Sequence, residues 1–137
     1  MNWKAVCRPI PCAMTLLLFA CTAAPLQPLT PVGAVTSSLR AVAAAQERYY
    51  TDHGTYSADL KALERYPGCV IQPRVTITFH EAGTRGWAAS GFHPAFPDRS
   101  CVQWVSRPDS VPVPRTLLEQ RRADEKPGGV VCDAPVQ

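Results

Sequence analysis

Residues 31–54 read PVGAVTSSLRAVAAAQERYYTDHG and contain no proline after the first residue. Apolar side chains recur there at steps of three and four residues, as in an α-helix with one buried face, and only Gln46 interrupts the stripe. The stripe consists of Val35, Leu39, Val42, Tyr49 and Tyr50. Thr30 and Pro31 form a favourable helix start, and Gly54 a favourable end. The stretch predicts an amphipathic helix over residues 31–52.

Beyond this helix the apolar residues change to a period of two, which is typical of half-buried strands. Three segments show this alternation: residues 74–79, 86–92 and 101–105. A turn at residues 82–84 and a loop at 93–100 are short enough to join antiparallel neighbours. We expect a meander of three to four strands that needs cover on one face.

A short second helix is expected over residues 57–65, with Ser57 as its cap. The fold class predicted for residues 32–106 is therefore α+β, with the long helix packed on the antiparallel sheet. Prolines crowd residues 107–137. We expect irregular structure there, with at most a brief helix between residues 115 and 125.

The beginning of the chain has the three parts of a secretory leader. Lys4 and Arg8 give a positive start, and a stretch of twelve apolar or small residues follows at 13–24. That stretch falls short of the roughly 20 residues that a membrane-spanning helix needs, but it suits the apolar region of a signal peptide. The sequence therefore predicts an exported protein.

The segment Leu18-Phe19-Ala20-Cys21 resembles a lipobox, the site at which bacterial lipoproteins are cut before a cysteine that carries lipid. Phe19 is bulkier than the usual residue there. The resemblance implies a signal peptide over residues 1–20, lipid on Cys21 and a proline-rich spacer over 21–31. The alternatives are ordinary cleavage after Ala23 or Ala24, giving a periplasmic or secreted protein, and an uncleaved anchor.

The charge balance argues against a nucleic-acid partner. The chain has 14 Lys and Arg against 11 Asp and Glu; without Lys4 and Arg8 the balance is 12 against 11, or +1. A chain so close to neutral lacks the basic footprint of a nucleic-acid-binding protein. The pair Arg121-Arg122 has acidic neighbours and is interpreted as a solvated face.

Residues 45–56 (AQERYYTDHGTY) resemble the segment of type IV pilins and pseudopilins in which the long N-terminal helix leaves the filament core. The strands at 86–92 and 101–105 fit the sheet of the same family, so the resemblance covers about residues 35–105. It implies a pilin-like head with a structural or interaction role, and other envelope, pilus or secretion proteins as partners.

The chain departs from that family at its start. Pilins have a processed Gly-Phe-Thr-Leu-x-Glu start and an unbroken apolar helix, whereas Met14-Thr15-Leu16-Leu17-Leu18 has no glycine before it and no glutamate five residues in. We therefore expect neither cleavage by prepilin peptidase nor packing into a pilus shaft. The pilin-like head is expected to follow a lipoprotein leader instead.

Three cysteines remain in the domain after the leader and Cys21: Cys69, Cys101 and Cys132. Thiols of exported proteins tend to pair. Because pilins commonly close their C-terminal region with a disulfide, the resemblance implies the pair Cys101–Cys132. The alternative is Cys69–Cys101, which would join the starts of two strands, and formation of neither pair is the third possibility.

The polar residues do not have the spacing of a catalytic or metal site. The histidines are scattered, without CxxC or HxxxH spacing, at His53, His80 and His93. Ser90 lacks the GxSxG surroundings of a nucleophile elbow. Asp52 and Asp59, a conceivable carboxylate pair, lie at predicted helix ends, where capping explains them. We expect no enzyme activity, no metal and no cofactor.

Two tryptophans are candidates for a binding surface. Trp87 and Trp104 lie on neighbouring predicted strands, and we expect them to pack in the core; the alternative is an aromatic platform, if they are exposed side by side.

The sequence as a whole predicts a non-enzymatic structural or interaction protein of the cell envelope, held on the membrane by lipid and facing the periplasm. The alternatives are a minor pilin or pseudopilin of a type IV pilus or type II secretion system, and a periplasmic domain that binds a small ligand.

Overall fold

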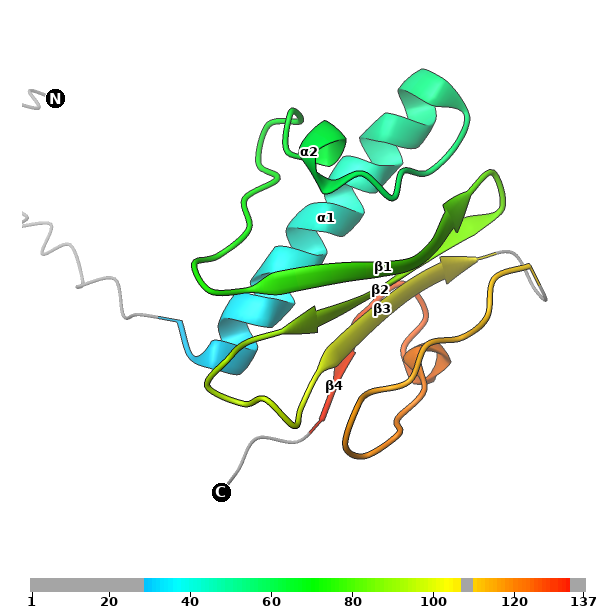
Figure 1. Cartoon of the computed structure of the whole chain (residues 1–137). Coiled ribbons are helices and arrows are strands. Elements are labelled where there is room, and N and C mark those ends of the chain that lie inside the picture. The colour runs from blue at the N-terminus through cyan, green and yellow to red at the C-terminus, as the bar shows by residue number, and fades with distance from the viewer. Residues whose placement is uncertain (1–28, 107–109, 134–137) are drawn as a thin grey trace, which may run out of the picture.

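A computed structural model describes residues 29–106 and 110–133 of the chain. One long helix crosses one face of a four-stranded antiparallel sheet, and the C-terminal segment lies against the other face (Figure 1). The elements in chain order are α1 (Pro31–His53), α2 (Leu60–Leu63), β1 (Thr76–Gly83), β2 (Gly86–Phe92), β3 (Cys101–Ser106), the 3-10 helix η1 (Ala123–Glu125) and β4 (Val130–Cys132). The predicted α+β class is confirmed.

Helix α1 begins and ends where local chemistry favours it. The Thr30 hydroxyl accepts a hydrogen bond from the Gly33 amide at 3.1 Å, and Pro31 occupies the first turn, where its missing amide hydrogen costs nothing. At the other end Gly54 adopts φ +69°, and its amide closes the last turn on the Tyr50 carbonyl. The helix predicted over 31–52 is confirmed to within one residue.

Gln46 interrupts the apolar stripe because it performs a specific polar task. Its side chain is fully buried and forms two hydrogen bonds with the backbone of Ser57, donating to the carbonyl at 2.6 Å and accepting from the amide at 2.9 Å. Ser38, also buried, accepts a hydrogen bond from the Gln72 amide at 2.9 Å. Both residues hold the chain that links α1 to the sheet, and both satisfy backbone groups that would otherwise be buried without partners.

The second helix is shorter than predicted, and its expected cap was wrong. It covers Leu60–Leu63, and Asp59 caps it by accepting from the Lys61 amide at 3.0 Å. Ser57 instead accepts from the Asp59 amide with its hydroxyl, while Gln46 occupies its backbone groups. The chain therefore cannot become helical until it has passed Asp59.

The four strands form a simple meander in the order β1-β2-β3-β4. Strand β2 matches the predicted segment 86–92, whereas β1 begins two residues later than predicted and continues to Gly83 through a bulge between Phe79 and Glu81. The fourth strand comes from the C-terminal region, where irregular structure was expected: Cys132 pairs with Cys101 across β3 and β4. A long-range pairing of only three residues leaves little periodicity to detect.

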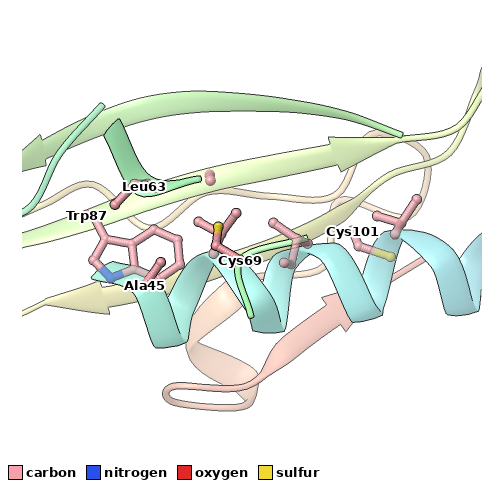
Figure 2. Packing of buried hydrophobic residues seen from close by; sticks show 9 residues of the cluster. Ala45, Leu63, Cys69, Trp87 and Cys101 are labelled. Atoms are coloured by element: carbon pink, nitrogen blue, oxygen red, sulfur yellow. The ribbon is translucent and has the colours of Figure 1, made fainter. Parts of the chain in front are cut away.

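The main core lies between α1 and the sheet (Figure 2). Its buried members are Val35, Leu39, Val42, Ala45, Leu63, Cys69, Trp87, Ala89 and Cys101. The helix lies close to β2 at Gly91, where an added Cβ would lie 2.5 Å from Cγ1 of Val35 and 3.3 Å from Cδ1 of Leu39. A side chain at this position would have to push the helix away from the sheet.

The opposite face of the sheet has a smaller core made by the C-terminal segment. Val102, Ala123 and Val131 are buried there, and Trp104 packs against them. Trp104 pairs across the strands with Ala88, not with Trp87, so the two tryptophans lie on opposite faces. The expected core packing is confirmed for Trp87, which is fully buried under α1, and the alternative of an aromatic platform is wrong. Trp104 joins the C-terminal segment to the sheet by donating to the Val111 carbonyl at 3.0 Å.

Substitution Gly91→Ala is expected to lower the free energy of unfolding by about 1–3 kcal/mol, because the new methyl group overlaps Val35. Urea denaturation monitored by circular dichroism measures the change. Gly83→Ala is the matched control, since a Cβ there meets no atom within 4 Å. The double variant Gly91→Ala/Val35→Ala should recover part of the loss. Equal stability of the Gly91→Ala and Gly83→Ala variants would show that the helix does not approach the sheet as described.

Substitution Gln46→Met retains the approximate size of the side chain but removes both hydrogen bonds to Ser57. We expect a loss of about 2–4 kcal/mol of unfolding free energy, since a buried amide and a buried carbonyl lose their partners. Arg40→Met, on the exposed side of the same helix, should change stability little. Thermal or urea unfolding of the two variants tests the assignment, and a Gln46→Met protein as stable as the wild type would refute it.

Candidate functional site

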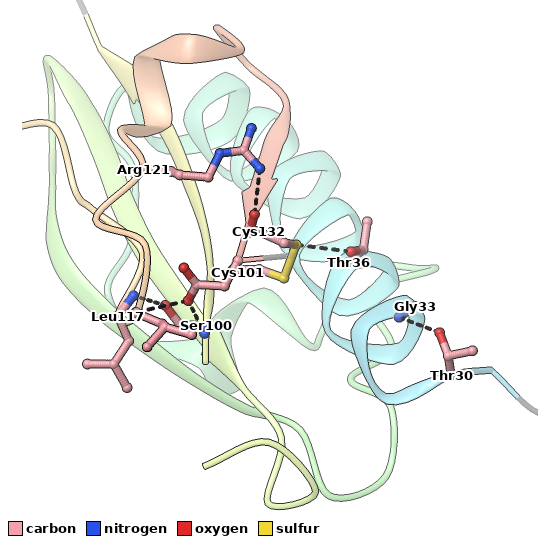
Figure 3. Close-up of a disulfide and its surroundings, with 10 residues drawn as sticks. Thr30, Gly33, Thr36, Ser100, Cys101, Leu117, Arg121 and Cys132 are labelled. Carbon is pink, nitrogen blue, oxygen red and sulfur yellow. Dashed lines mark hydrogen bonds between the residues drawn. A yellow bond between two sulfur atoms is a disulfide. The ribbon is translucent and has the colours of Figure 1, made fainter. Parts of the chain in front are cut away.

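A disulfide joins Cys101, the first residue of β3, to Cys132, the last residue of β4. The two cysteines face each other across the strands, and Sγ of Cys132 lies 3.6 Å from the Thr36 hydroxyl of α1 (Figure 3). The bond closes a segment with a sequence separation of 31 residues. Such a loop contributes roughly 3.5 kcal/mol to stability in the chain-entropy account. We call this end of the domain, where α1 and β3 begin and β4 ends, the disulfide end.

The alternative pairing of Cys69 with Cys101 is not formed. Cys69 is a free thiol, 7% exposed, in the core between α1 and the sheet. Burial, with a smaller contribution from the negative charge of Glu64, raises the pKa of the Cys69 thiol. A buried thiol with a raised pKa is a poor nucleophile, so Cys69 serves as a small core residue.

Asp133 is the polar centre of the disulfide end. Its carboxylate is 2% exposed and accepts hydrogen bonds from three backbone amides: Ser100 at 2.9 Å, Leu118 at 3.1 Å and Glu119 at 2.7 Å. Burial by itself would raise the pKa of Asp133, but hydrogen bonds from the Thr116 hydroxyl and these amides outweigh it and lower the pKa. Asp133 is therefore a buried anion that joins β4, the start of β3 and the segment after Thr116.

The segment from Thr116 to Arg121 is held as a compact turn. The Thr116 amide donates to the Arg121 carbonyl at 2.9 Å, and the Arg121 amide donates to the Thr116 hydroxyl at 2.9 Å. The Arg121 guanidinium donates to the Cys132 carbonyl at 2.8 Å (Figure 3). It also forms an ion pair with Glu125. The sequence analysis allowed a brief helix between 115 and 125, and the structure has this turn followed by η1.

Two leucines in this turn, directly after Thr116, have exposed side chains. Leu117 is 48% exposed and Leu118 is 47% exposed. Their backbone amides point the other way: that of Leu117 donates to the Ser100 hydroxyl at 2.8 Å, and that of Leu118 to Asp133. We call the pair Leu117–Leu118 the leucine tip. Because both backbone amides are hydrogen-bonded to the rest of the domain, the tip presents its apolar side chains to solvent from a fixed backbone.

A small recess lies between the first turn of α1 and the disulfide end. Pro31, Val32 and Val35 line one side of it, and Ser100 and Asp133 belong to the other. With a volume of about 20 Å³ it has room for a group the size of a water molecule. The recess is too small for an organic ligand, but it shows that the start of α1 lies next to the residues that hold the leucine tip.

One nucleophile–base pair was missed by the sequence analysis. Nε2 of His80, which was interpreted as a histidine at the end of a strand, lies 2.5 Å from the hydroxyl of Ser90. His80 occupies the bulge of β1 and is exposed, whereas Ser90 is 3% exposed on the face covered by the C-terminal segment. The two larger recesses on that side, near Trp104 and near Glu81, do not include Ser90. The Ser90 hydroxyl is therefore almost completely covered in the described part of the chain.

The remaining polar candidates have structural partners. The His53 ring stacks on Tyr49, and the His93 ring accepts a hydrogen bond from the Ala95 amide at 3.1 Å. Asp52 accepts from the Tyr66 hydroxyl, and Asp59 caps α2, so these two carboxylates are engaged separately. Within residues 29–106 and 110–133, no group of three or more His, Cys, Asp or Glu side chains could hold a metal ion.

The predicted lipid attachment site, Cys21, lies outside the described residues. None of the helices in the described part of the chain combines the length and the apolar character needed to cross a bilayer. Neither a known protein family nor a curated protein matches the sequence.

Asp133, Ser100 and the leucine tip were not singled out by the sequence analysis. Asp133 directly follows Cys132, so its proximity to the disulfide was visible, but its partners lie 14 to 33 residues away in the sequence. The adjacent leucines in a polar, proline-rich segment were the other available signal. Two apolar residues without a period predict neither burial nor exposure.

Substitution Asp133→Asn is expected to lower the unfolding free energy by about 1–3 kcal/mol at neutral pH, because a charge-assisted acceptor of several amides is lost. The folded-state pKa is depressed, so the stabilisation by the carboxylate is present above the unfolded pKa, near 3.8, and is lost as the pH falls through the folded pKa. The stability gap between wild type and variant should therefore narrow as the solution is acidified below that value.

Urea denaturation at about pH 7 and about pH 3 measures this gap. Asp98→Asn, at an exposed position in the loop before β3, is the matched control and should leave the neutral-pH stability nearly unchanged. A gap of constant size across this range would show that Asp133 does not act as a buried anion.

Proposed function

We propose that this chain is an exported, non-enzymatic protein of the cell envelope, with a pilin-like head that is tethered to a membrane by lipid on Cys21 and faces the periplasm. The Cys101–Cys132 disulfide is the observation that carries the proposal. A bond of this kind persists in an oxidising compartment and is rare in the cytosol. It agrees with the secretory leader that the first 24 residues resemble.

The arrangement of helix and sheet supports the pilin-like part of the proposal. An N-terminal amphipathic helix crosses an antiparallel meander, and the disulfide ties the C-terminal strand to that meander. The leader lacks the glycine and the glutamate that pilin processing and shaft packing require. We therefore assign the head to a scaffold or adaptor role, in which surface complementarity with other envelope or secretion proteins provides the affinity.

The start of α1 supports the tether. Its cap, Thr30, follows Cys21 by only nine residues, and three prolines lie between them or directly after. Prolines favour extended chain and disfavour helix, so a spacer of this composition separates the folded head from an attachment point. A lipid on Cys21 would thus hold the head close to the membrane surface.

Intact-mass measurement of the full chain, expressed in bacteria and extracted from membranes, tests this proposal. We expect a mature protein that begins at Cys21 with the added mass of lipid, because the leader ends in a lipobox-like segment. Acyl chains add about 0.8 kcal/mol of membrane affinity per buried methylene, so the protein should fractionate with membranes. Under non-reducing conditions Cys69 alone of the three domain cysteines should react with an alkylating agent after unfolding.

Cys21→Ser should abolish the lipid-modified species, whereas Cys12→Ser, within the leader, should leave it unchanged. A lipid-free protein that begins after Ala23 or Ala24 would refute the tether and favour plain secretion. An uncut chain, or a start with a methylated residue, would favour the minor pilin or pseudopilin alternative.

A further inference from the structure

We propose that the leucine tip, Leu117–Leu118, rests on the lipid bilayer that holds the tether, so that the disulfide end is the membrane-facing end of the head. This inference rests on the proposed lipid attachment at Cys21. It adds an orientation and a second membrane contact, which the presence of a tether alone does not provide.

The distribution of exposed apolar side chains supports it. In the described part of the chain, the exposed large hydrophobic residues are Leu29, Val70, Leu117 and Leu118. Three of these four lie at the disulfide end: Leu29 directly precedes the cap of α1, and the leucine tip is fastened to Ser100 and Asp133 beside the first turn of α1. Leu117 and Leu118 are adjacent, and contiguous exposed apolar surface marks interaction sites more often than single scattered residues do.

The fixed backbone of the leucine tip also favours binding to another surface. Its amides donate inward to Ser100 and Asp133, and the Leu117 side chain points away from the disulfide (Figure 3). The backbone of the tip is thus fixed by hydrogen bonds to the Ser100 hydroxyl and to the buried Asp133 carboxylate, close to the disulfide, while both leucine side chains remain exposed to solvent. This preorganisation lowers the entropy that the side chains and backbone lose when they insert into another phase.

The length of the tether favours a bilayer as the occupant. From Cys21 to Leu29 there are eight residue steps, which span at most about 28 Å when fully extended. The chain enters the head at Leu29, and therefore at the disulfide end. The bilayer that holds the tether is therefore within reach of the leucine tip, because the spacer joins the head at the same end.

Two half-exposed leucines would bind a bilayer only weakly if the head were free. Tethering changes this balance, because it makes the second contact intramolecular, with an effective concentration set by the length of the spacer. The charges beside the tip are mixed, with Arg115 and Arg121 balanced by Glu119 and Glu125. The contact should therefore depend on apolar insertion and respond little to salt or to the charge of the lipids.

A tryptophan scan on the full-length protein tests the proposal. The variants Leu118→Trp and Val70→Trp each place an indole at an exposed apolar position, the first on the tip and the second, 60% exposed, just before the segment that leads into β1. Both proteins are purified from bacterial membranes, their mass is measured, and they are reconstituted in phosphatidylcholine vesicles with brominated acyl chains. Bromine quenches only an indole that enters the hydrocarbon region.

We expect brominated lipid to quench the tryptophan fluorescence of the Leu118→Trp protein roughly twice as much as that of the wild type, and high salt should not change this. The Val70→Trp protein should be quenched no more than the wild type. In the background Leu117→Ser the Leu118→Trp signal should weaken, since half of the apolar tip is removed. Lipidated protein without quenching at position 118 would overturn the docking but leave the tether intact, and would point to a protein partner for the tip. Absence of lipid from the purified protein would refute tether and docking together. Loss of quenching in high salt would refute apolar insertion.

Discussion

The close approach of α1 to β2 at Gly91 is the contact on which the rest of the domain depends. Because this residue has no Cβ, Val35 and Leu39 settle directly on the sheet, and the helix covers Trp87 completely. Once the helix is fixed at this depth, its buried polar side chains reach the backbone on either side. Gln46 forms hydrogen bonds with the backbone of Ser57, before α2, and Ser38 accepts one from the Gln72 amide. The position of the helix on the sheet therefore also fixes the path of the connecting segment.

The second face of the sheet is stabilised differently. Its apolar core is small, and a domain of this size buries proportionally less surface than a larger one. The C-terminal segment is instead joined to the sheet by one covalent bond and by hydrogen bonds that converge on the buried Asp133 carboxylate. Covalent and charge-assisted links of this kind replace the missing hydrophobic area, and they gather at the end of the domain where α1 begins.

The disulfide and the hydrogen bonds of Asp133 make the two ends of the domain different. In the orientation that we propose for the leucine tip, the disulfide end lies near the membrane, and α1 runs from there to its other end at Gly54. The spacer that follows Cys21 would then set the greatest distance between the head and the bilayer. The free thiol of Cys69 takes no part, since it is enclosed in the core.

The sequence by itself determined the elements whose causes are local. Helix α1 with its caps and strand β2 follow from periodicity and from glycine, proline and threonine at fixed positions, and the Cys101–Cys132 pair followed from a family resemblance. Only the tertiary structure decided the short α2, the pairing of β4, the separation of the two tryptophans and the role of Asp133. Each of these depends on partners far apart in the chain, and neither a helical nor a strand period carries information about hydrogen bonds between distant segments.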